Sequence, residues 1–402
     1  MAPSRRAAAL VLLALILIGS VVALPYLNAI GFIVRAADIG GTPGTMASWG
    51  TSAITRGPAI QVPTRSGEVP ARVYEPAAGA SRTILLLPGV HRDGIDEVRL
   101  IGLAEDLAAT GYRVMTIAAP DLQRFTITPA VTDVIEDAVL WASTQPQLAA
   151  DGRVGVIGVS FSGGLAIVAA GRPSIRDRVA FVMSFGGHGD LARVMHYLCS
   201  GEVVGDLESA RQSSAVVGAD HVRVHPPHDY GVAVVLLSLA DRVVPADQVD
   251  GLARGINGFL LASSLAMTAA DAATLEFGRM REYAETLPEP SRTLMRLVND
   301  RAVDKLGPLL LPEADALKDH PMMASLSPER AAPPAAPVFL LHGVDDNVIP
   351  SVETVFLAEH LRGTADVHGL LSGLITHAEA NLAPSAGEVW RLARFWRQVM
   401  SD

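Results

Sequence analysis

The segment at residues 153–164, with the sequence RVGVIGVSFSGG, constrains the fold of this chain more than any other feature. It begins as an apolar strand at residues 153–157 and passes through glycine and serine residues into an apolar helical run at 165–170. A serine at such a turn is held in strained backbone geometry, with its hydroxyl clear of the sheet. The segment therefore predicts a strand–turn–helix unit with Ser160 as a candidate nucleophile.

Small residues must flank this serine because the strand and the helix approach each other closely there. Gly158 is one of them, and Ser162 takes the place of a second glycine. The amide of Phe161, at the start of the helix, would stabilise a developing oxyanion. The alternative interpretation is a glycine- and serine-rich turn without chemistry.

A serine nucleophile needs a base, and the base needs an acid that orients it. At this kind of turn the chain order is serine, acid, histidine. Asp346 follows an apolar strand in the segment LHGVDDNVIP (341–350), and His377 follows the next expected strand in GLITH (373–377). Strands of a parallel sheet end at a common edge, so we expect Ser160, Asp346 and His377 to meet there.

Several other residues compete for these roles. Asp345 replaces Asp346 if the loop shifts by one residue, and Asp190 follows the strand expected at 179–185. Asp241 repeats the acid motif in DRVVP, where we interpret it as a helix cap. His368 lies within a strand pattern and is expected to be packed rather than catalytic.

Strand and helix patterns alternate in the first part of the chain and return at its end, which predicts an α/β fold with a mostly parallel sheet flanked by helices. Between them, long helical patterns, clearest at 259–280 and 294–306, predict a large helical cap insertion. The expected segments are a membrane anchor or signal peptide (1–35), a linker (36–53), the first part of the core (54–187), the cap (188–336) and the second part of the core (337–402). The expected strands are 59–63, 69–74, 83–87, 112–118, 153–157, 179–185, 338–341 and 365–371, and the expected core helices are 100–110, 131–143, 165–170, 352–361 and 388–399.

The N-terminus resembles an export signal. Arg5 and Arg6 precede an apolar run at residues 7–18 that resumes and reaches about residue 27. The run approaches the ~20 residues that cross a bilayer, which favours an uncleaved hydrophobic anchor. Residues 21–23 leave open a cleaved signal peptide. In either case we expect the catalytic domain outside the cytoplasm, on the cell membrane or else secreted or periplasmic.

Composition excludes several other classes of protein. The 402 residues are 50% hydrophobic and 18% charged, which excludes a disordered chain. The formal charge of −10 and the lack of a basic block argue against binding to nucleic acid. Cys199 is the single cysteine, so the chain has neither an internal disulfide nor a multi-cysteine zinc site, and we expect Cys199 to be a small buried hydrophobe.

A histidine cluster lies in the expected cap. His221, His225 and His228 could bind a metal ion, but Pro226 and Pro227 prevent a regular helical face and no second ligand cluster is evident. We therefore expect a solvated group of loop histidines. No metal and no organic cofactor is predicted.

Together, these segments resemble the α/β-hydrolase superfamily, nearest to its dienelactone-hydrolase-like and prolyl-oligopeptidase-like members. The stretch LLLPGV (85–90) is similar to the family's strand and oxyanion loop, and LAATGYRV (107–114) to its next helix and strand. The serine turn and HGVDDNVIP (342–350) complete the likeness, which covers residues 59–187 and 337–402. The resemblance implies an α/β-hydrolase fold in which Ser160 is the nucleophile, His377 the general base and acid, and Asp346 its orienting acid.

The resemblance also implies an oxyanion hole formed by the amides of Phe161 and Val90. His91 is the alternative to Val90, because Pro88-Gly89 stands where many relatives have His-Gly. Dienelactone hydrolases proper use a cysteine where this chain has Ser160, which argues against their substrate.

The expected function is that of a serine hydrolase that cleaves a carboxylic ester through an acyl-enzyme intermediate. The expected partner is a small-molecule ester, with an apolar acyl group if the cap covers a selective pocket. An acyltransferase or a peptidase would use the same triad, and a membrane-tethered binding protein could retain the fold without turnover. The sequence does not determine the oligomeric state.

Overall fold

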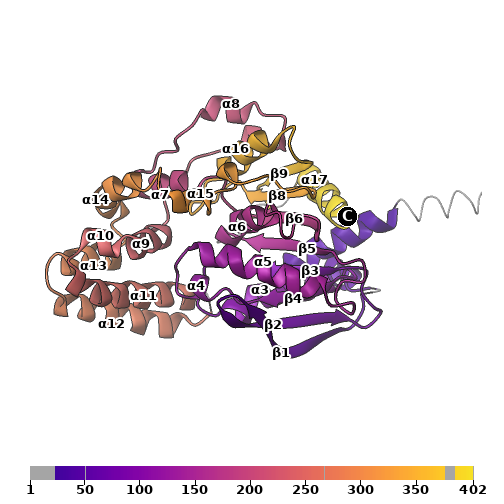
Figure 1. Cartoon of the computed structure of the whole chain (residues 1–402), viewed down its shortest axis with the longest axis horizontal. Coiled ribbons are helices and arrows are strands. Elements are labelled where there is room, and N and C mark those ends of the chain that lie inside the picture. The colour runs from indigo at the N-terminus through magenta and orange to yellow at the C-terminus, as the bar shows by residue number, and fades with distance from the viewer. Residues whose placement is uncertain (1–22, 50, 267, 376–384, 402) are drawn as a thin grey trace, which may run out of the picture.

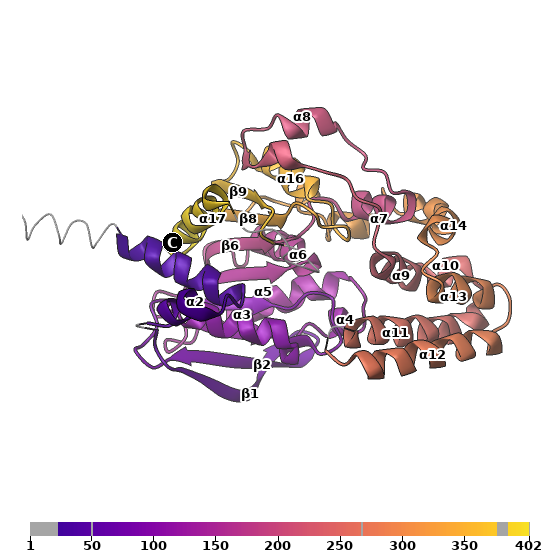
Figure 2. The same cartoon turned by 180° about the vertical axis from the view of Figure 1, so that it is seen from behind.

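The structure is a computed structural model that describes residues 23–49, 51–266, 268–375 and 385–401. Its centre is a nine-stranded sheet with the order β1-β2-β4-β3-β5-β6-β8-β9-β7 (Figures 1 and 2). β2 is antiparallel to β1 and β4, and the remaining neighbours are parallel. The strands are β1 (Ile54–Thr64), β2 (Gly67–Pro76), β3 (Thr83–Leu87), β4 (Arg113–Ile117), β5 (Val154–Val159), β6 (Val179–Phe185), β7 (Val216–Val217), β8 (Val338–Gly343) and β9 (Val367–Ser372).

Strand β3 shows why the central strands are apolar throughout. Successive side chains of a strand point to opposite faces of the sheet. Ile84 and Leu86 lie in one hydrophobic cluster, and Leu85 and Leu87 lie in the other. Both faces of the sheet are therefore buried, as the continuous apolar run predicted.

Helices cover both faces of this sheet. One cluster joins the sheet to α5 (Pro129–Ser143), α6 (Phe161–Ala170) and α16 (Val352–Leu361). The other joins it to α3 (Val98–Ala108) and α17 (Ala386–Val399). The predicted α/β core with a mostly parallel sheet is confirmed.

The N-terminal region differs from the prediction. Residues 23–36 form a helix whose Ala29, Phe32 and Ile33 are buried in the same cluster as α3 and α17. The rings of Phe32 and Trp396 lie 4.4 Å apart. Within residues 23–35, the last part of the segment predicted at 1–35 to be an anchor or signal peptide, these three side chains therefore pack on the protein's own core, whereas Leu24 and Leu27 are exposed. Residues 1–22 lie outside the described part of the chain.

No helix within the described ranges is both long and apolar enough to cross a bilayer. The stretch predicted to be a linker contains the short helix α2 (Gly41–Ala47). Arg35 links the two helices to the core: it donates to the carbonyl of Ala47 over 2.8 Å and pairs with Asp106 of α3 at 3.3 Å. This segment thus forms part of the folded structure.

The insertion at 188–336 is mostly helical, and in Figures 1 and 2 its helices α11 to α13 lie on the opposite side of the molecule from α17. It also contains β7, which pairs with β9 at the edge of the sheet. Its helices are α7 (Leu191–Ser200), α8 (Leu207–Arg211), α9 (Asp229–Ser238), α10 (Ala240–Val243), α11 (Val249–Leu265), α12 (Ala270–Thr286), α13 (Ser291–Asn299), α14 (Val303–Ala316) and α15 (Pro321–Ala324). A further short helix, α4 (Pro120–Gln123), follows β4 in the core.

Two helices that the sequence predicted in the cap are each divided in the structure. The apolar pattern at 259–280 belongs to α11 and α12, which fold back on each other so that Phe259 and Phe277 lie 5.5 Å apart between ring centroids. The pattern at 294–306 is broken before α14, where Arg301 has a φ of 54°. One long helix and two shorter helices that pack against each other can give the same periodic pattern of apolar residues. Helical periodicity therefore does not show where one helix ends and the next begins.

Candidate active site

Ser160 lies at the turn between β5 and α6. Its φ of 58° and ψ of −133° are unusual for a residue with a side chain, and such strain is often found at functional sites. The Ser160 N–H donates to the carbonyl of Phe185 over 2.7 Å, which fixes the turn to the end of β6. The predicted strand–turn–helix unit is therefore present, with Ser160 at its strained position.

Close packing around the turn explains the residues on either side. A Cβ at Gly158 would lie 2.2 Å from the carbonyl oxygen of Ser162, so glycine is required there. The buried Ser162 hydroxyl accepts from the Val159 N–H over 2.8 Å and donates to the Val159 carbonyl over 2.9 Å. Ser162 is thus small enough to fit and also closes the turn with its own hydrogen bonds.

The two predicted oxyanion donors belong to segments beside Ser160. Phe161 is the first residue of α6, so its N–H has no acceptor within the helix and lies at the positive end of the helix dipole. A Cβ at Gly89 would lie 3.4 Å from the Cβ of Ser160, which brings the loop after β3 against the turn. Val90 follows in this loop, and its carbonyl accepts a hydrogen bond from the Tyr230 hydroxyl over 2.7 Å.

His91, the alternative to Val90, is the next residue of the same loop. Its side chain is half-buried, and burial lowers the pKa of His91 below its ordinary value. Its Nδ1 lies 3.3 Å from the backbone N–H of Asp93, from which it accepts. These contacts hold the imidazole within the loop and favour its neutral form.

Asp346 is a buried carboxylate on the loop between β8 and α16, with 4% of its surface exposed. Its Oδ1 accepts from the backbone N–H groups of Val348 at 2.9 Å and Ile349 at 3.0 Å. Its Oδ2 lies 3.3 Å from His342 Nε2. A Cβ at Gly186, just after β6, would lie 3.6 Å from Oδ2. The carboxylate is therefore fixed at the end of β6, the strand that lies between β5 and β8.

The rival carboxylates make other contacts. Asp345 is about half exposed and lies 3.2 Å from His225 Nε2. Asp190 caps α7 by accepting from the Arg193 N–H at 3.2 Å, and it pairs with Arg330 at 2.7 Å. Asp241 is an exposed residue within α10, whose N-cap is Leu239, so its predicted role as a cap is wrong.

Of the two candidate histidines, His368 is half-buried in β9, and its ring stacks on Phe339 with centroids 5.0 Å apart. His377, the predicted base, lies outside the described residues. Of the predicted site residues, the structure describes Ser160, Phe161, Val90 and Asp346, and it places these four at one edge of the sheet.

Two fully buried histidines near the site were missed by the sequence analysis. His342 Nε2 bonds to the Ile349 carbonyl over 3.0 Å, and Nδ1 accepts from Thr354 at 2.8 Å. His188 Nε2 donates to the Leu326 carbonyl at 2.7 Å, and its ring lies 5.7 Å from that of Phe161. Burial lowers the pKa of His188, so it is neutral and acts as a packing residue behind the turn. Each lies at or just after an apolar strand, a position that gives no local signal of such contacts.

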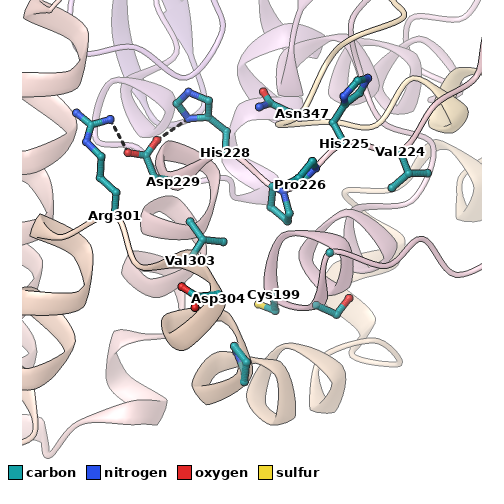
Figure 3. A pocket seen from close by; sticks show the side chains of 14 residues that line it. Cys199, Val224, His225, Pro226, His228, Asp229, Arg301, Val303, Asp304 and Asn347 are labelled. Atoms are coloured by element: carbon teal, nitrogen blue, oxygen red, sulfur yellow. Dashed lines mark hydrogen bonds and ion pairs between the residues drawn. The ribbon is translucent and has the colours of Figure 1, made fainter.

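A pocket of about 1010 Å³ lies next to the acid loop and is bordered by α7, by the segment before α9 and by α14. Figure 3 shows the side chains that line it. Asn347, which follows Asp346, lies on one side, and Cys199 and Asp304 lie on another. Cys199 is buried as predicted, and burial raises the pKa of its thiol to about 12, so it is protonated at neutral pH.

The clustered histidines form separate pairs rather than one site. His228 caps α9 and lies 2.7 Å from Asp229, which pairs in turn with Arg301 at 2.6 Å (Figure 3). His225 faces Asp345, and His221 lies 3.9 Å from Asp220. Within the described ranges, no group of three or more histidine, cysteine or acidic side chains is placed to hold a metal ion.

Comparison with known proteins gives matches in structure but not in sequence. No protein-family model matches the chain, and no curated protein matches its sequence. Similar solved structures include a dienelactone hydrolase from Anabaena variabilis (16% identity, 86% of this chain and 96% of that chain, TM-score 0.38). A second is an esterase from Pyrobaculum calidifontis, with 14% identity, 95% of this chain and 94% of that chain covered, and a TM-score of 0.41. A third is dipeptidyl peptidase 4 from Porphyromonas gingivalis, with 10% identity, 87% of this chain and 36% of that chain covered, and a TM-score of 0.45.

The family that the sequence resembles is the α/β-hydrolase superfamily. The resemblance is confirmed at the level of fold by the chain's own geometry, which consists of the mostly parallel sheet, the strained serine between β5 and α6, and the buried acid after β8. Function is argued from the site itself.

Proposed function

We propose that this protein is a serine hydrolase that cleaves a carboxylic ester through an acyl-enzyme intermediate. Ser160 is the nucleophile, His377 the general base and acid, and Asp346 the residue that orients His377. The amides of Phe161 and Val90 form the oxyanion hole. No step in this mechanism needs a metal ion or an organic cofactor.

The reaction proceeds in two halves. Ser160 Oγ attacks the ester carbonyl carbon while His377 takes the hydroxyl proton, and the oxyanion hole stabilises the negative oxygen of the tetrahedral intermediate. Collapse of the intermediate breaks the bond to the alcohol, which leaves with the proton from His377. A water molecule, deprotonated by His377, then attacks the acyl-enzyme and releases the acid and free Ser160.

The observation that carries this proposal is the backbone of Ser160. A non-glycine residue at a φ of 58° needs a structural reason, and the glycine at position 158 and the hydrogen bonds of Ser162 supply one. The result is a half-buried serine hydroxyl at the N-terminus of α6, where the helix dipole favours negative charge. The fixed carboxylate of Asp346 at the same edge supports the proposal, because a triad acid must be oriented and deprotonated.

The size and apolar content of the insertion support an ester with an apolar acyl chain as the substrate. Its helices α7, α9, α11 and α14 contribute many buried side chains to the larger hydrophobic cluster. A pocket beneath such a cap would select acyl groups by the area that they bury. We therefore expect turnover to rise with acyl length beyond acetyl.

The test is turnover of a p-nitrophenyl ester series, together with labelling by a fluorophosphonate probe, for the full chain and for Ser160→Ala. Ser264→Ala is the matched control, because the Ser264 hydroxyl donates to the Leu260 carbonyl within α11. We expect the wild type and Ser264→Ala to be labelled and active, and Ser160→Ala to lose both properties. Labelling that survives Ser160→Ala would contradict the assignment of the nucleophile.

Other outcomes separate the remaining functions. A protein that is labelled at Ser160 but does not hydrolyse simple esters would indicate a peptidase or an acyltransferase that requires a particular acceptor. A folded protein with neither labelling nor turnover would favour a binding protein that retains the fold. A chain-length profile that peaks at acetyl would contradict the apolar acyl pocket.

We also propose that the enzyme works outside the cytoplasm. Arg5 and Arg6 before the apolar run at 7–18 support export. Fusion of residues 1–49 to alkaline phosphatase tests this directly, because that reporter is active only after export. An inactive fusion that accumulates in the cytoplasm would contradict the proposal.

A further inference from the structure

A tyrosine of the cap makes direct contact with the proposed oxyanion loop. Tyr230 is the second residue of α9, and its hydroxyl donates to the carbonyl of Val90 over 2.7 Å. Two residues earlier, the backbone N–H of His228 donates to the carbonyl of Asn347 over 2.9 Å. The chain at 228–230 therefore connects the loop of the acid to the loop of the oxyanion hole.

The position of this tyrosine is fixed from several sides. Its ring meets the buried Phe125 edge-on, with centroids 6.3 Å apart. Its backbone N–H donates to Asp229 Oδ1 at 2.9 Å and lies 3.1 Å from His228 Nδ1. Burial raises the pKa of Tyr230, so its hydroxyl keeps its proton and remains a donor throughout the neutral range.

We infer that Tyr230 is a positioning residue for the oxyanion hole, which it supports by holding the carbonyl of Val90. The inference rests on the proposed function, because it assigns Tyr230 a role in the same reaction. Tyr230 does not take part in proton transfer. Its hydroxyl fixes one side of the residue whose other side carries the N–H donor.

The physical reason lies in the backbone of the loop. The carbonyl of Val90 shares a rigid peptide plane with the N–H of His91, so the hydrogen bond from Tyr230 fixes that plane and limits rotation about the Cα–C bond of Val90, the residue that carries the donor. Val90 follows Gly89, which has no Cβ to restrict its own rotation. A donor stabilises an oxyanion only if it is already oriented when the negative charge develops. Without the hydroxyl, the peptide plane after Val90 would be free to turn until the carbonyl met water or another donor, and the loop would no longer hold the Val90 N–H in one orientation.

The test compares Tyr230→Phe with Tyr283→Phe in the full chain. Both substitutions keep the ring and remove a hydroxyl that donates to a backbone carbonyl of the protein, that of Val90 at 2.7 Å and that of Gly251 at 3.0 Å. The Gly251 carbonyl lies within the cap, in α11, so Tyr283→Phe reports the loss of an equivalent hydrogen bond away from the site. The kinetic constants are calculated per active site titrated with a fluorophosphonate, so unfolded protein does not affect them.

We expect Tyr230→Phe to lower kcat for a p-nitrophenyl ester about tenfold with KM unchanged, less than the ~10²–10³-fold that follows loss of a whole oxyanion donor. Affinity for a boronic acid, which mimics the tetrahedral intermediate, should fall by the same factor. Tyr283→Phe should keep both values within twofold. A role in stability alone would lower the melting temperature of both variants without this loss of kcat.

Specific results would overturn the inference. These are a kcat for Tyr230→Phe within twofold of the wild type, a change confined to KM, or an equal loss in Tyr283→Phe. If Tyr230→Phe does not fold, Tyr230→Leu provides a second variant, because it also removes the hydroxyl that donates to Val90. An unchanged kcat per titrated site in that variant would contradict the inference. Failure of the proposed function itself is distinct, since it appears as a wild type that is neither labelled nor active.

Discussion

Gly158 and Ser162 approach so closely that a Cβ on the first would lie 2.2 Å from the carbonyl oxygen of the second. This approach brings the start of α6 against the end of β5 and leaves Ser160 at a positive φ. The position of the proposed nucleophile therefore depends on the absence of a side chain two residues before it.

We expect Gly158→Ala to reduce turnover at least a hundredfold and to destabilise the protein by about 1–3 kcal/mol, because the clash is with backbone atoms that cannot move aside. Gly102→Ala in α3 is the control, since a Cβ there would meet nothing within 4 Å. That substitution should be neutral or stabilise the protein by up to ~1 kcal/mol. Ester turnover and urea denaturation measure both effects, and a Gly158→Ala variant as active as Gly102→Ala would contradict this account of the turn.

Asp346→Asn should lower kcat by about 10³–10⁴-fold, because an amide cannot stabilise the histidine cation that forms during catalysis. Asp345→Asn, at the residue just before Asp346 and about half exposed, should stay within threefold of the wild type. Asp190→Asn should lose stability, since Asp190 caps α7 and pairs with Arg330, and should keep its turnover. Steady-state kinetics with all three variants tests the assignment, and loss of turnover in Asp190→Asn alone would transfer the role of the acid to Asp190.

His188 should make the protein less stable in mild acid. Burial lowers the pKa of His188 below the ordinary value of 6.5, so below that pH the unfolded chain takes up a proton that the folded protein does not. The contribution to stability is therefore complete above about pH 6.5 and is lost as the pH falls, with a slope of up to ~1.4 kcal/mol per pH unit. The burial of His91 acts in the same direction.

The measurement is the free energy of unfolding in urea at pH 7.5, 6.0 and 5.0 for the wild type and His188→Gln. Glutamine keeps a donor for the Leu326 carbonyl but does not titrate, so the variant should show a shallower loss of stability between pH 6.5 and 5.0. Carboxylates contribute equally to both proteins and cancel in the comparison. Equal slopes would show that His188 is not held neutral in the fold.

The helix at 23–36 should contribute to the stability of the core. Phe32→Ala should destabilise the protein by about 3–5 kcal/mol, because Phe32 is 2% exposed and packs on Trp396. Leu27→Ala in the same helix should change stability by less than ~0.5 kcal/mol, because Leu27 is 60% exposed. Thermal denaturation of both variants decides the matter, and a Phe32→Ala protein as stable as Leu27→Ala would separate this helix from the core.

Local patterns in the sequence determined the core of this protein. The strand Thr83–Leu87, the strand Val179–Phe185 and the helix Val352–Leu361 were predicted with the bounds that the structure has. The turn at Ser160 was also predicted, because its glycine and serine residues and the apolar strand before it lie within one short segment. Such features depend on backbone geometry and on the periodicity of burial, which neighbouring residues express directly.

Tertiary structure alone decided how distant segments meet. The apolar residues of 23–35 suited a membrane as well as a protein core, and only the tertiary structure shows that Ala29, Phe32 and Ile33 are buried against α3 and α17. The hydrogen bond from Tyr230 to Val90 joins residues 140 positions apart. The physical reason is that a buried hydrogen bond depends on where two parts of the fold come together, whereas the residues on either side of each partner record only whether that part is helical, extended, buried or exposed.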